Sequence, residues 1–138
     1  MSTSIFSSVA QKHLTDATLL LAQDRYDNAY YLSGYVVEAS LKVLLAFDGM
    51  PAVKELGHNL EMMTGNALML AYHLAPSRRR YNPGTSAELE NIIQNWRPEA
   101  RYDAEGTYNK AQAESEIRGA TFAYEQIVIA MKLDGNLK

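Results

Sequence analysis

The sequence contains no cysteine, which excludes disulfide bonds and thiolate zinc sites. Long apolar runs are also missing, because stretches such as LMLAY at 68–72 fall far short of the roughly 18 residues that a membrane-spanning helix needs. The first residues lack a basic segment followed by an apolar run and a cleavage site, so we expect no signal peptide. We therefore expect a soluble, cytoplasmic protein with no membrane association, folded as one domain over residues 1–138.

An excess of positive charge is missing as well. The formal net charge is −3, which argues against binding of nucleic acid by overall electrostatic attraction. Only a local cluster of basic residues could provide such binding. The one dense basic run is SRRRY, in which Arg78, Arg79 and Arg80 precede Tyr81. This basic patch is either a phosphate-binding loop or, as we favour, a solvated loop.

Metal-binding and cofactor motifs are absent too. The histidines are scattered and lack the two-histidine helical spacing of a zinc site, and no glycine-rich loop has the lysine and hydroxyl residue of a P-loop. The sequence therefore predicts no metal and no cofactor. Asn59 or His58 is expected near the cap of a helix that starts there, and His58 is otherwise expected to be a hydrogen-bonded hinge.

What is present is helical periodicity in every long segment, with no convincing period-two alternation, which predicts an all-α fold. A short helix should follow a capping box formed by Thr85 and Glu88 and include Trp96 as a core anchor. Loops are predicted at 75–86 and from Arg97 onward. The longer helices are predicted over 5–24, 27–48 (the central helix), 59–73 and 110–133.

The stretch RYDNAYYLSGYVVEASLK, residues 25–42, places polar groups on a helix that is otherwise apolar. Gly34 costs about 1 kcal/mol relative to alanine inside a helix, which is usually tolerated where something approaches the backbone closely. One turn later, the Glu38 carboxylate needs a cationic partner if it is buried. Both features fit close helix packing with a structural salt bridge, and they also fit a ligand site. The residues by themselves favour the first of these. The candidate partners of Glu38 are Lys42, Arg97 and, the one we favour, Arg101.

This stretch resembles the second-helix region of HEPN domains, a family of small helical domains associated with nucleotide binding. GHNL at 57–60 and ARY at 100–102 resemble the starts of the family's next and final helices, in the same order. The resemblance implies an antiparallel, up-and-down bundle of four to five helices that dimerises and is often encoded beside a minimal nucleotidyltransferase. It implies a ligand groove between the second and last helices, for which the predicted residues are Tyr31, Gly34, Tyr35, Glu38, Lys42, Arg101 and Tyr102.

Family members that act as metal-independent ribonucleases carry an arginine followed after four to six residues by a histidine. No arginine of this chain has a histidine at that spacing, and Arg101 is followed after six residues by Tyr108 instead. A phenol with a pKa near 10 is a poor general base at neutral pH. Arg101 and Tyr108 are therefore weak catalytic candidates.

Two functions follow from the resemblance. The first is a non-catalytic HEPN-type module that binds a nucleotide-like or polyanionic ligand, or a nucleotidyltransferase partner. The alternative is a divergent ribonuclease toxin of a toxin-antitoxin system. A homodimer is expected in either case, because the long helices carry apolar residues on more than one face.

Overall fold

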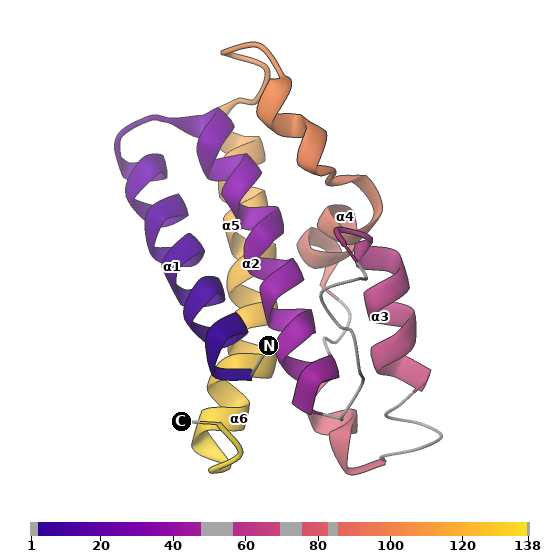
Figure 1. Ribbon diagram of the computed structural model, residues 1–138. Coiled ribbons are helices and arrows are strands. Elements are labelled where there is room, and N and C mark those ends of the chain that lie inside the picture. The colour runs from indigo at the N-terminus through magenta and orange to yellow at the C-terminus, as the bar shows by residue number, and fades with distance from the viewer. Residues whose placement is uncertain (1–2, 48–56, 70–75, 83–85, 138) are drawn as a thin grey trace.

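The computed structural model describes residues 3–47, 57–69, 76–82 and 86–137, and every regular element in these ranges is helical (Figure 1). The prediction of an all-α bundle is confirmed. The α-helices are α1 (Thr3–Ala22), α2 (Tyr26–Phe47), α3 (Leu60–Met69), α4 (Ala87–Asn95), α5 (Lys110–Tyr124) and α6 (Ala130–Leu133). Two 3₁₀ helices, η3 (Pro76–Tyr81) and η4 (Pro98–Tyr102), and the π-helical segment η5 (Glu125–Ile129) complete the elements.

Helix α2 is the central helix, as its wide apolar surface predicts. It contacts α1, α3, α4 and α5, and nearly all of its second half is buried, including Val36, Leu41 and Leu44. On α1, the fully buried contact residues Ala10 and Ala17 are small, which allows the two backbones to approach closely. This central position puts the polar residues of α2 inside the bundle.

The helix directions differ in part from the up-and-down prediction. Helices α1 and α2 run antiparallel, but α2 and α5 begin at the same end of the molecule (Figure 1). The Asp27 carboxylate, in the first turn of α2, accepts hydrogen bonds from the backbone N–H groups of Gly106 (2.8 Å) and Tyr108 (3.0 Å), just before α5. The two helices are parallel because the chain between them, which includes α3 and α4, returns to the end of the molecule where α2 begins.

The structure has the predicted cap at α3 and shifts the predicted cap of α4 by one residue. The side chain of Asn59 accepts a hydrogen bond from the backbone N–H of Met62 (2.9 Å) and so caps α3, as expected; the predicted residues 70–73 of this helix lie outside the described ranges. At α4 the N-cap is Ser86, whose hydroxyl accepts from the backbone N–H of Leu89. The predicted capping box with Glu88 is therefore one residue off, and Thr85 lies outside the described ranges.

The final predicted helix, 110–133, is one continuous helical segment with a change of pitch. A reciprocal capping box of Asn109 and Gln112 starts α5, and the wider π turns of η5 link α5 to α6. Tyr124 and Met131, on either side of the π segment, are both in the core. The wider turns adjust the phase of the helix so that both stretches face the core.

Candidate functional site

Four polar side chains of α2, Tyr31, Tyr35, Glu38 and Lys42, form a line along one side of the helix, which we call the α2 seam. Their spacing of three or four residues places successive members one turn apart. The hydroxyl of Tyr31 donates a hydrogen bond to that of Tyr35 (3.1 Å), and their rings meet edge to face with centroids 5.1 Å apart. The tyrosines are half-buried, whereas Glu38 and Lys42 are buried.

Glu38 lies at the centre of the seam and is only 7% exposed. One carboxylate oxygen is hydrogen-bonded to Nδ1 of His58, and the other lies 3.9 Å from Nζ of Lys42. Burial raises the pKa of the Glu38 carboxyl above its ordinary value, and His58 and Lys42 oppose that shift. The sequence prediction that Arg101 is the partner of Glu38 is wrong. Lys42 was a candidate, but His58 was not considered.

Of the two roles that the sequence allows for Gly34, close packing and ligand binding, the structure shows close packing. The indole of Trp96 lies directly against it, so that a Cβ added at Gly34 would overlap the ring. The indole N–H donates to the backbone carbonyl of Tyr31 (3.0 Å), and the ring packs edge to face against Tyr35 (4.9 Å between centroids). Trp96 is therefore a core anchor, as predicted, and it fills the space that we had assigned to a ligand at Gly34.

Arg101 and Tyr102 end the 3₁₀ helix η4 and point away from the core. The guanidinium of Arg101 lies 4.7 Å from the ring centroid of Tyr102 and donates a hydrogen bond to its hydroxyl (2.9 Å). Tyr102 is 75% exposed, which is unusual for so large an aromatic side chain. Tyr102 and then Tyr31 raise the pKa of Arg101, and Arg101 opposes the burial-driven rise in the pKa of Tyr35. The pair therefore lies beside the tyrosine end of the α2 seam.

A pocket of about 220 Å³ opens beside the exposed ring of His58. Arg97 and Glu61 also line it, and their side chains lie 4.0 Å apart. Because the Glu38 carboxylate accepts from Nδ1 of His58, Nε2 is left to exchange a proton with a ligand. The pocket thus combines an oriented imidazole with a guanidinium, an arrangement able to bind an anion and transfer a proton.

Tyr108 is not among the residues that line the pocket beside His58. Its ring stacks on Tyr30 with centroids 3.8 Å apart, and its hydroxyl donates to a carboxylate oxygen of Asp103 (2.6 Å). Burial, and then this hydrogen bond, raise the pKa of Tyr108 above its ordinary value. A general base needs a lowered pKa, so these contacts argue against the catalytic role considered for Tyr108.

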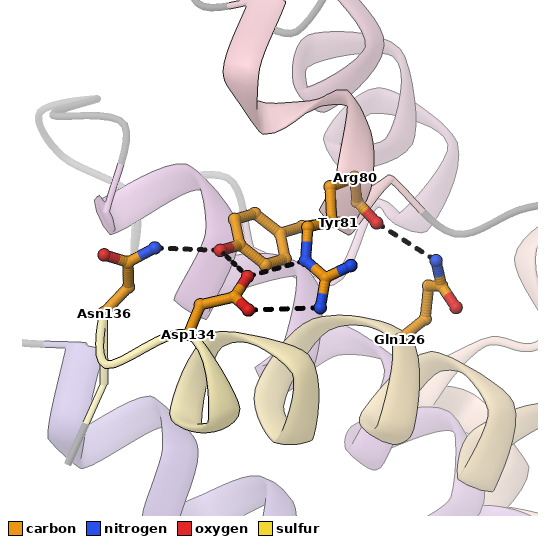
Figure 2. Close-up of polar contacts among 5 residues, drawn as sticks. All are labelled: Arg80, Tyr81, Gln126, Asp134 and Asn136. Atoms are coloured by element: carbon orange, nitrogen blue, oxygen red, sulfur yellow. Dashed lines mark hydrogen bonds and ion pairs between the residues drawn. The ribbon is translucent and has the colours of Figure 1, made fainter.

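Part of the predicted basic patch has a structural role, because Arg80 and Tyr81 bind to Asp134 (Figure 2). The guanidinium of Arg80 donates two hydrogen bonds to Asp134 (2.6 and 3.1 Å), and its backbone carbonyl accepts from Gln126 (3.1 Å). The hydroxyl of Tyr81 donates to the same carboxylate. Arg80 and Tyr81 hold the pKa of Asp134 below its ordinary value.

These contacts fasten η3 to the end of the C-terminal helix, so Arg80 is not displayed for phosphate. The side chain of Arg78 lies outside the part of the chain that the structure describes. Arg79 is exposed in η3 but is not without contacts.

The structure thus brings together Tyr31, Tyr35, Arg101 and Tyr102 at one end of the seam, and Glu38, Lys42 and His58 at the other. The sequence did not predict His58 as the partner of Glu38. One feature of the sequence could have indicated this contact. His58 directly precedes the N-cap of α3, a helix that has to pack on α2. In the described ranges, no group of three or more histidine or acidic residues is arranged to hold a metal ion, and no helix is long and apolar enough to cross a membrane.

Comparison with known proteins gives no family for this chain. No protein-family model matches it, and neither a curated protein nor a solved structure is significantly similar to it.

We expect Glu38→Gln to lower the free energy of unfolding by about 1 kcal/mol, because it leaves the buried ammonium of Lys42 without its charged partner, while relief of the burial cost that raises the Glu38 pKa offsets part of that loss. Glu61→Gln is the matched control. It removes an exposed carboxylate from a 4.0 Å pair with Arg97 and should change stability by less than about 0.5 kcal/mol. Urea unfolding at pH 7 measures both. Equal midpoints for the two variants would contradict the buried ion pair.

Proposed function

We propose that the chain is an HEPN-type binding module for a nucleotide-like or other phosphate-bearing ligand. Its docking point is the Arg101–Tyr102 pair beside Tyr31 and Tyr35. The resemblance of residues 25–42, 57–60 and 100–102 to the family supports the assignment. The contacts of Arg101 support the ligand class.

The observation that carries the proposal is that Arg101 differs in its partners from four other arginines of the described ranges. Arg25, Arg80, Arg97 and Arg118 each lie within 4.0 Å of a carboxylate. Within the part of the chain that the structure describes, no carboxylate pairs with Arg101, whose contacts are tyrosines. A guanidinium held in place without neutralisation is suited to bind phosphate oxygens.

Tyr102 supplies the second element of such a site. Its ring is held by Arg101 at the surface and offers an aromatic face on which a base can stack. The hydroxyls of Tyr31 and Tyr35 lie close by and can bond to a sugar or phosphate. A homodimer and a nucleotidyltransferase partner remain parts of this proposal that follow from the resemblance.

We expect Arg101→Ala to weaken binding of a fluorescein-labelled single-stranded RNA about tenfold and to reduce the salt slope by about 0.7, the value for one lost phosphate contact. Tyr102→Ala should also weaken binding, because it removes a stacking surface. Arg118→Ala is the control, since Arg118 is exposed and paired with Glu88 at 3.7 Å. Fluorescence anisotropy at several salt concentrations measures all three. Equal affinities of Arg101→Ala and Arg118→Ala would refute the docking point.

A second candidate function, RNA cleavage without metal, is favoured by the Glu38–His58 pair. A carboxylate that orients an exposed imidazole beside Arg97 supplies a base and a cation that the Arg101–Tyr108 arrangement lacks. Incubating the same RNA with the protein in EDTA distinguishes the two functions. Cleavage that is lost in His58→Asn and kept in Tyr108→Phe would establish the enzyme in place of the binding module.

A further inference from the structure

A second polar pocket, of about 420 Å³, lies at the first half of α5, between residues of α2 and α4. Its lining includes Tyr30, Asn91, Asn95, Ser115 and Glu116. Glu116 is the unusual member, because it is an acidic residue that is 1% exposed. Buried carboxyl groups are normally paired with a cation or fully hydrogen-bonded.

Glu116 has one hydrogen bond, which leaves half of its carboxyl group unused. Asn91 donates to Oε1 (3.2 Å), and Asn95 in turn donates to the side-chain oxygen of Asn91 (2.7 Å), so this relay fixes the orientation of the amide that faces Glu116. The other oxygen, Oε2, is buried and has no hydrogen-bond partner. When Glu116 is ionised, Oε2 is a buried acceptor without a donor, which is destabilising unless a bound group supplies one.

The other polar groups of the pocket complement that missing donor. Among the described contacts, no hydrogen bond occupies the hydroxyls of Tyr30 or Ser115. No lysine, arginine or histidine is among the lining residues, so no cationic side chain of the lining competes for the Glu116 carboxyl group. We propose that this pocket binds a small ligand carrying a protonated amine or guanidinium, whose N–H groups donate to Glu116 and the neighbouring hydroxyls.

Binding of a cation must be linked to loss of a proton from Glu116. Burial raises the pKa of this carboxyl to about 8, so the empty pocket holds the neutral acid at pH 7. The two tyrosines nearby stay neutral across this range, because burial raises the pKa of Tyr30 on α2 to about 12 and also raises that of Tyr108. The other charged groups nearby are Asp103, before α5, and the Glu88–Arg118 ion pair at the α4–α5 contact.

The test uses methylguanidinium, which stays charged at every pH of interest, and its neutral isostere N-methylurea. In ¹H–¹⁵N correlation spectra at pH 8.5, methylguanidinium should shift the amide signals of Asn91, Ser115 and Glu116 saturably. N-methylurea should not. Affinity at pH 6.5 should be weaker by at least about tenfold, because the proton on Glu116 must first leave.

Glu116→Gln should abolish the saturable shifts, while Glu114→Gln should keep them, since Glu114 faces Lys110 (3.9 Å) rather than the pocket. The spectra themselves report whether each variant is folded. Equal binding of the neutral probe, affinity independent of pH, or unchanged binding in folded Glu116→Gln would each overturn the proposal.

Discussion

Replacing Gly34 by alanine should destabilise the protein by about 3 kcal/mol, although alanine is the better helix former by about 1 kcal/mol. The added methyl group would overlap the indole of Trp96, which is 1% exposed. Moving the ring would also break its hydrogen bond to the carbonyl of Tyr31. Thermal unfolding should show a fall of roughly 10 °C in the midpoint.

Gly65→Ala is the matched control, because Gly65 also lies inside a helix but has no atom within 4 Å of an added Cβ. There the intrinsic preference is unopposed, and the variant should gain between about 0.5 and 1 kcal/mol. Trp96→Leu tests the cause. If the clash is with the indole, Gly34→Ala should be much less harmful in the Trp96→Leu background, as a double-mutant cycle reports. Additive effects would contradict a direct contact.

The fold followed from the sequence where the deciding interactions are local. Apolar periodicity located the long helices, and the polar side chain of Asn59 marked the start of α3. The breadth of the apolar surface of α2 identified it as central. Each of these features depends on residues within a few turns, so no knowledge of the tertiary arrangement is needed.

Choices among distant partners were not predictable in the same way. Glu38 had three cations within reach by sequence argument, and nothing local shows that the turn before α3 brings His58 to it. The parallel course of α2 and α5 likewise depends on how α3 and α4 return the chain. The requirement for a partner at Glu38 was correctly predicted, because it comes from the physics of a buried charge rather than from the fold.

Glu116 is a residue that the sequence could have revealed. It lies three residues after Ala113 and four before Ala120, and both alanines are fully buried in the structure. A glutamate on the apolar face of a helix is a signal that a carboxyl group is buried. Glu116 is isolated in the sequence, whereas the tyrosines and glutamate of the second helix form a conspicuous cluster.

Glu116→Gln should make the protein more stable at alkaline pH and leave it nearly unchanged at pH 4.5 or below. Burial raises the folded-state pKa of Glu116 from about 4.5 to about 8, so the folded protein holds this proton more tightly than the unfolded chain. The resulting stability is fully present below about pH 4.5 and is lost as the pH rises through 8. Glutamine does not ionise, and it can accept the same hydrogen bond from Asn91.

The expected gain at pH 8.5 is about 3 to 4 kcal/mol, which corresponds to most of the shift at 1.36 kcal/mol per pKa unit. Urea unfolding of the parent and the variant at pH 4.5, 6.5 and 8.5 measures it. Glu114→Gln, which removes a half-buried carboxylate two residues away on the same helix, should change the free energy of unfolding by less than about 0.5 kcal/mol. A stability difference for Glu116→Gln that stays constant from pH 4.5 to 8.5 would mean that this carboxyl titrates normally. Loss of methylguanidinium binding together with higher alkaline stability would instead separate the role of Glu116 as a ligand group from any role in holding the fold.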